Sequence, residues 1–104
     1  MTDVISVVKK VREDIEKNGI DEQKVLEAIA SIDTKGEIRN IVLVLSWGGP
    51  NIIATIVPPV IKIEGFWGGN YFFDIIDNNK LANELFDKFA SYFEGIEVKA
   101  SPSN

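Results

Sequence analysis

The chain has 104 residues, sixteen acidic against eleven basic side chains, a formal charge of −5, and neither cysteine nor histidine. This length fits one domain, and the two missing residue types exclude disulfides, Cys- or His-ligated metals and Ser-His or Cys-His nucleophilic pairs. The basic residues are scattered along the chain, which disfavours a nucleic-acid groove or an anionic membrane surface. We therefore expect no nucleic-acid partner and no membrane partner.

An uncharged run between Arg39 and Lys62 has about the length that a bilayer requires. Its middle is interrupted by Gly48-Gly49-Pro50-Asn51 and its end by Pro58-Pro59, and its apolar residues are mainly β-branched. Two buried strands therefore fit this run better than one lipid-spanning helix does. The amino terminus carries Asp3 and lacks the leading basic region of a signal peptide, so the sequence predicts a cytoplasmic protein.

Two amphipathic helices are expected at the start of the chain, followed by a turn. The first runs from Thr2 or Asp3 to Asn18, with Gly19 as its stop signal. The second follows Asp21 and ends in the turn-rich residues 33–36. We expect these helices to form a hairpin that covers one face of a sheet. The apolar positions that indicate them are Val4, Val8, Val11 and Ile15 in the first and Val25, Ala28, Ile29 and Ile32 in the second.

Four strands are predicted next, over residues 37–46, 52–57, 60–67 and 71–76, arranged as an antiparallel meander. A third helix follows the capping residues 77–79 and ends at Gly95. The predicted fold class is therefore α+β, with two N-terminal helices, a four-stranded antiparallel meander sheet and a C-terminal helix. Residues 1–96 form the predicted single domain, and residues 97–104 a mobile tail with at most one edge-strand contact, from Ile96 to Val98.

The motif Trp-Gly-Gly occurs twice, each time where a predicted strand ends. One hypothesis is a binding surface, because Trp is favoured at binding hot spots and successive amides after glycine can hold an anion. The alternative, which we favour because turn glycines are common, is that each indole covers a glycine turn and closes an end of the core. The candidate interaction residues are Trp47, Gly48, Gly49, Pro50, Asn51, Phe66, Trp67, Gly68, Gly69, Asn70 and Tyr71.

Between Leu45 and Asn70, and in the last predicted helix near Phe89, the sequence resembles a scattered group of small uncharacterised proteins. Their shared pattern is a strand ending in Gly-Gly-Pro-Asn-Ile, a hairpin that returns to a Trp-Gly-Gly motif, and a closing acidic helix. The resemblance implies this topology and implies no activity. Pro58-Pro59 departs from the pattern, because polar turn residues are expected at that hairpin.

Three carboxylates, Glu64, Asp74 and Asp77, fall on or just after neighbouring predicted strands. Such a group can bind Mg²⁺ without histidine. Asp77 is more simply a helix cap, however, and no nucleophile or oxyanion donor stands at a recognisable spacing. We therefore expect no catalytic residue, no metal and no cofactor.

Four aromatic residues lie around the third and fourth predicted strands: Phe66, Tyr71, Phe72 and Phe73. A stacking platform for single-stranded nucleic acid needs positive charge beside it, and Lys62 is the only basic residue nearby. Core packing or a protein interface explains these aromatic residues better.

The strands carry more apolar residues than one covered face requires. An antiparallel sheet covered by helices on one side can bury its other face in a two-fold dimer. The leading hypothesis is therefore a non-enzymatic protein-interaction module, a homodimer that associates through its sheet and its Trp-Gly-Gly turns. One alternative is an acidic inhibitor or immunity-type protein that presents Glu84, Asp87 and Glu94 to a basic partner. The other is a carboxylate- and Mg²⁺-dependent enzyme.

Overall fold

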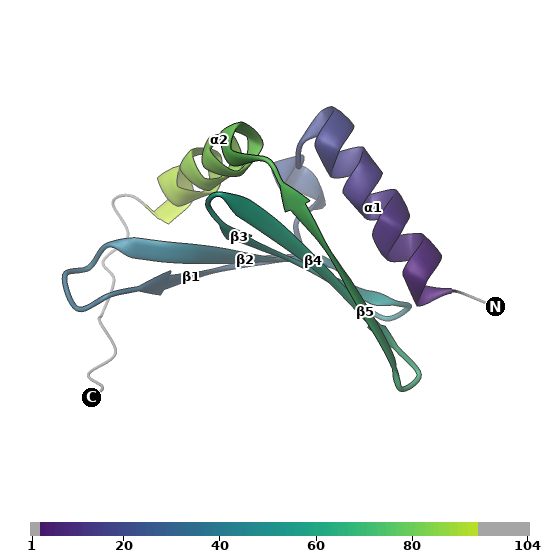
Figure 1. The fold of residues 1–104 in the computed structure, drawn as a ribbon. Helices are drawn as coiled ribbons and strands as arrows, with labels where there is room; N and C mark the ends of the chain where they lie inside the picture. The colour runs from purple at the N-terminus through teal and green to yellow at the C-terminus, as the bar shows by residue number, and fades with distance from the viewer. Residues whose placement is uncertain (1–2, 94–104) are drawn as a thin grey trace.

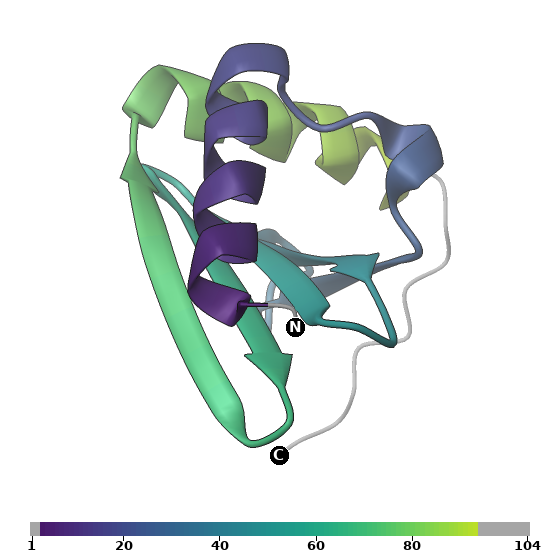
Figure 2. The same cartoon turned by 90° about the vertical axis from the view of Figure 1, so that its right-hand side faces the viewer.

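A computed structural model describes residues 3–93 as one layer of strands beneath one layer of helices (Figure 1). The strands β1 to β5 form a single antiparallel meander in which each strand pairs with the next in the chain. The helices α1 and α2 lie on the same side of this sheet, which a second view also shows (Figure 2). The elements in chain order are α1 Val4–Asn18, the 3₁₀ turn η1 Glu22–Lys24, β1 Glu27–Ile32, β2 Ile38–Ser46, β3 Asn51–Val57, β4 Val60–Trp67, β5 Asn70–Asp77, α2 Asn79–Ala90 and the 3₁₀ turn η2 Ser91–Phe93.

The α+β class, the antiparallel meander, the first helix and the four predicted strands are confirmed. The predicted second helix is wrong, and with it the helical hairpin and the number of strands. Residues 22–24 form only a short 3₁₀ turn, and residues 27–32 form a fifth strand at the edge of the sheet. The predicted last helix ends earlier than expected, because α2 gives way to a 3₁₀ turn after Ala90. Residues 97–104 and the predicted domain end at residue 96 lie outside the described residues.

The β1–β2 hairpin explains why the second helix does not form. Asp33 closes its turn, since its Oδ1 accepts hydrogen bonds from the backbone amides of Lys35 and Glu37, both at 2.9 Å. Pairing with β2 then satisfies the backbone of β1, with Ala28 opposite Leu43. The apolar residues of the predicted second helix are spaced as in a helix, but several of them are β-branched and suit a strand equally well.

The helix α1 has the ends that its sequence predicts. Asp3 Oδ1 accepts a hydrogen bond from the amide of Ile5 at 3.1 Å, and the amide of Gly19 donates to the carbonyl of Ile15 at 2.9 Å. Gly19 has φ +71°, which suits glycine at this stop position. At the other end of the domain, Asn78 caps α2 by accepting from the amide of Leu81 at 3.0 Å. No helix within residues 3–93 is long and apolar enough to cross a membrane.

The core lies between the helices and one face of the sheet. Strand pairing brings residues of this helix-side face into cross-strand rows of small and aliphatic side chains. The helix α1 lies over β4 and β5, and α2 lies over β2, β3 and β4. The two longest rows are Ala28, Leu43, Ala54, Ile63 and Asp74, and Ala30, Ile41, Ile56, Ile61 and Ile76.

Gly65 marks the closest approach of α1 to the sheet. A Cβ atom built on Gly65 would lie 2.6 Å from Cγ2 of Val8 and 3.1 Å from Cγ1 of Val4. Both valines are buried and β-branched, so neither can turn aside easily. The missing side chain at position 65 therefore sets how near α1 can pack.

Arg12 joins α1 to the edge strand β5. Its Nη1 lies 3.0 Å from Oδ2 of Asp74, the only charged residue in the two helix-side rows named above. The hydrogen bond from Arg12 holds the pKa of Asp74 below its ordinary value of 3.8, although partial burial acts in the opposite direction. The ion pair thus allows a charged side chain to lie beneath the helix layer.

We expect the substitution Gly65→Ala to lower the free energy of unfolding by about 1–3 kcal/mol, because the new methyl group overlaps Val8. Urea unfolding followed by far-UV circular dichroism measures this change. Val8→Ala removes the clashing methyl groups, so the double variant should lose less stability than the sum of the two single losses. Strictly additive losses would contradict this packing contact.

The Arg12–Asp74 pair predicts a dependence of stability on pH. Because the pKa of Asp74 is lower in the folded state, its contribution is present above pH 3.8 and is lost as the pH falls through the lowered pKa. Asp74→Asn should cost up to about 1 kcal/mol at neutral pH, since the side chains are 36% and 25% exposed. Urea midpoints should show this difference narrowing between about pH 5 and pH 3. Arg12→Gln should behave likewise, and a constant difference would contradict the assignment.

Candidate functional site

The sheet face opposite the helices is more apolar than polar, and no described helix or strand packs against it (Figures 1 and 2). We call it the open face and define it by two cross-strand rows. Its exposed large side chains lie on the edge strands, with Ile29 at 47% and Phe73 at 46%, whereas Val44 nearer the centre is only 9% exposed. An apolar surface of this extent is typical of an interaction site. The two rows are Glu27, Val44, Ile53, Glu64 and Phe73, and Ile29, Val42, Thr55, Lys62 and Ile75.

Aromatic rings extend the open face along β4 and β5. The rings of Phe66 and Tyr71 stack with centroids 5.7 Å apart and planes 14° apart, and the ring of Phe73 lies 6.2 Å beyond Tyr71. Phe72 has the opposite orientation and packs against the helix-side core. The four predicted aromatic residues therefore separate into three on the open face and one on the core side.

Polar groups on the open face hold one another in place. The hydroxyl of Tyr71 donates a hydrogen bond of 2.7 Å to Oε2 of Glu64, and this bond raises the pKa of Tyr71 above its ordinary value, with a smaller effect from burial. Nζ of Lys62 lies 3.8 Å from the same carboxylate oxygen and 4.9 Å from the ring centroid of Phe73. One positive and one negative charge therefore lie side by side on the open face, which also carries Glu27 and Thr55.

The two Trp-Gly-Gly motifs form neighbouring turns at one end of the sheet. In the second turn, Trp67 pairs with Asn70, so Gly68 and Gly69 make a two-residue loop. Their φ angles of +58° and +85° fit a type I′ hairpin turn, which glycine adopts without strain. The first turn is held by Asn51, whose Oδ1 accepts a 2.7 Å hydrogen bond from the amide of Gly48.

The two tryptophans have different environments. The ring of Trp67 lies over the first turn, since a Cβ atom built on Gly49 would be 3.5 Å from its Cη2 atom. Trp67 therefore covers a glycine turn, but the turn belongs to the other motif. Trp47 is 68% exposed and lines a depression of about 200 Å³ with Leu26, Glu27 and Val44. Trp47 thus extends the open face.

The three candidate carboxylates do not converge. Glu64 lies on the open face and Asp74 on the helix-side face, since neighbouring residues of β4 pair with Phe73 and Asp74 of β5. Asp77 is the exposed last residue of β5 and directly precedes the capping residue of α2. Within residues 3–93, no group of three or more acidic side chains is arranged to hold a metal ion.

The last helix does not present a surface of one charge. Glu84 and Asp87 are exposed on α2, as are Lys80 and Lys88. Lys88 also pairs with Glu22 at 3.0 Å, which joins α2 to η1. The described part of this helix therefore carries mixed charge, whereas the inhibitor hypothesis requires an acidic surface. Glu94 lies outside the described residues.

Sequence reasoning missed the contribution of β1 to the open face. Ile29 was placed on a helix, and Leu26, which is 62% exposed beside Trp47, was not singled out. The alternation of Ala28, Ala30 and Ile32 before a turn-rich stretch was the available signal for a strand.

Comparisons with protein-family models, with curated proteins and with solved structures found no match to this chain.

The two tryptophans should respond differently to truncation. Trp67→Ala should lower the free energy of unfolding by about 1–2 kcal/mol, because the indole packs over Gly49. Trp47→Ala should change it by about 0.5 kcal/mol or less, because that side chain is largely exposed. Urea unfolding followed by circular dichroism at low protein concentration measures both. Equal losses would contradict the distinction between a turn-covering and a surface tryptophan.

Proposed function

We propose that this protein is a non-enzymatic interaction module that forms a homodimer through its open face. The single observation that carries the proposal is the apolar open face, which spans all five strands and has no described element packed against it. Leaving this surface in water is unfavourable, and burial gains roughly 25 cal/mol per Å² of apolar area. A second copy of the chain offers a surface of the same chemistry.

The area of the open face suits a small dimer interface. Five strands about 4.8 Å apart, with about seven residues each at 3.3 Å per residue, cover on the order of 550 Å². Two copies then bury roughly 1,100 Å², an area that treats each sheet as flat and omits the protruding side chains. Specific interfaces bury about 1,200–2,000 Å². The protruding side chains of Trp47 and Leu26 at the margin supply further contact area.

The charges on the open face favour a two-fold arrangement. Lys62 and Glu64 point from the same strand to the same face, and a second copy related by a two-fold axis presents these two charged groups in the reverse order. In a two-fold sheet-on-sheet contact, each copy can place its ammonium near the carboxylate of the other. Because both charges then have partners, their burial carries a smaller penalty than that of an isolated charge.

We expect Ile29→Glu to weaken dimerisation about 100-fold, because an unpaired carboxylate would enter an apolar contact at a cost near 3 kcal/mol. Ile5→Glu is the matched control, since Ile5 is 44% exposed on α1 and Ile29 is 47% exposed on the open face. Sedimentation equilibrium over a range of protein concentrations measures the dissociation constants. Circular dichroism should show that both variants remain folded.

A wild-type chain that stays monomeric at high concentration would overturn the proposal. So would equal weakening by Ile29→Glu and Ile5→Glu, since Ile5 lies on the helix layer. Phe73→Ala provides a second check on the same face. We expect it to weaken dimerisation about tenfold, because it removes one aromatic contact.

A further inference from the structure

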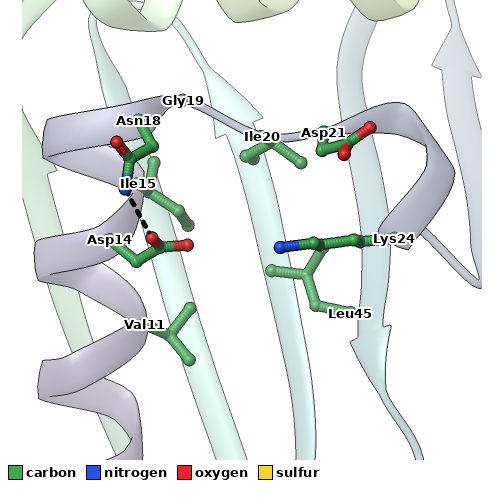
Figure 3. A pocket seen from close by; sticks show the side chains of 9 residues that line it. All are labelled: Val11, Asp14, Ile15, Asn18, Gly19, Ile20, Asp21, Lys24 and Leu45. Atoms are coloured by element: carbon green, nitrogen blue, oxygen red, sulfur yellow. Dashed lines mark hydrogen bonds between the residues drawn. The ribbon is translucent and has the colours of Figure 1, made fainter.

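A hollow of about 420 Å³ opens on the helix side of the sheet, away from the open face (Figure 3). It lies between the last turns of α1 and the η1 segment, above the end of β2. The hollow exists because α1 lies over β4 and β5 and does not cover this end of β2. Its volume falls in the range of roughly 300–1,000 Å³ that is usual for small-molecule sites.

The inner surface of the hollow is apolar. Val11 and Ile15 of α1 form one wall, Ile20 lies at the top, and Leu45 of β2 lies at the base. Ile15 and Ile20 belong to the buried core and are only 2% and 5% exposed, so the half-buried Val11 and Leu45 supply most of the apolar surface that a ligand can reach. A ligand with an aliphatic or aromatic group can therefore bury that group against a rigid surface.

Two opposite charges enter the hollow from its two sides. Figure 3 shows the carboxylate of Asp14 and the ammonium of Lys24 pointing toward one another across the opening. Asn18 Nδ2 donates a 2.8 Å hydrogen bond to Oδ1 of Asp14, which orients that carboxylate. Among the ion pairs within residues 3–93, none includes Asp14 or Lys24.

The remaining carboxylate of the rim has another role. Asp21 Oδ1 accepts a 2.9 Å hydrogen bond from the amide of Gln23 and so caps η1. Asp14 is therefore the anion that faces the hollow, and Lys24 is the cation. A ligand that complements this arrangement carries one ammonium, one carboxylate and one apolar group.

We propose that this hollow binds a free apolar α-amino acid, whose ammonium contacts Asp14, whose carboxylate contacts Lys24 and whose side chain lies against Val11 and Leu45. The charge order of the rim and the apolar inner surface together select this class. A neutral apolar molecule contacts neither charge, and a molecule with one charge gains only one of the two charged contacts. Binding is expected to be weak, with a dissociation constant near about 1 mM, because both charged contacts are exposed to solvent.

The test is a two-dimensional ¹H–¹⁵N NMR titration of the full chain with L-phenylalanine up to about 10 mM. Saturable shifts are expected at the amides of Val11, Ile15, Ile20 and Leu45. N-acetyl-L-phenylalanine lacks the ammonium, and L-phenylalanine amide lacks the carboxylate. Each should bind about fivefold or more weakly than L-phenylalanine, because each gains only one of the two charged contacts.

Matched variants locate the contacts. Asp14→Asn and Lys24→Gln should each weaken binding of L-phenylalanine by about fivefold or more. Glu13→Gln and Lys10→Gln make the same charge changes at exposed positions of α1 outside the hollow and should leave binding unchanged. Absence of saturable shifts, shifts confined to other surfaces, equal binding of the three compounds, or equal binding by all four variants would each overturn the proposal.

Discussion

The close contact between α1 and β4 at Gly65 is the interaction on which the rest of the arrangement depends. With no side chain at this position, the valines of α1 pack directly on the sheet, where a Cβ atom would lie 2.6 Å from Val8. The helix therefore lies low over β4 and β5, within reach of Asp74 through Arg12. Its position also leaves the end of β2 partly uncovered, and this uncovered end is the base of the hollow beside Leu45.

Two helices cover one face of the five-stranded sheet, and no described element covers the other face. Side chains alternate along each strand, so a run that is apolar at successive residues must place apolar groups on both faces. The inner face meets the helices, whereas the outer face carries Ile29, Phe73 and Ile75 at substantial exposure. The charges of Lys62 and Glu64 on this face lie beside one another, and Glu64 also accepts a hydrogen bond from Tyr71. The physical case for a partner rests on this imbalance between the faces.

The Trp-Gly-Gly motifs show how one pattern can serve two purposes. Both create tight turns, and the turns are adjacent because Asn51 and Phe66 pair across β3 and β4. Trp67 covers the glycine of the neighbouring turn, while Trp47 lies exposed next to Leu26. A structural role and a surface role are therefore divided between the two copies of the motif.

The sequence was enough to locate α1, four strands and the start of α2, because capping residues, turn glycines and apolar alternation act over a few residues. It also determined that the sheet carries more apolar surface than one layer of helices can cover. The tertiary structure was needed to show that residues 27–32 are a strand, since the pairing partner that stabilises them lies beyond a turn closed by Asp33. It alone placed Glu64 and Asp74 on opposite faces and Asp14 opposite Lys24, because such distances depend on packing between distant segments and not on local preference.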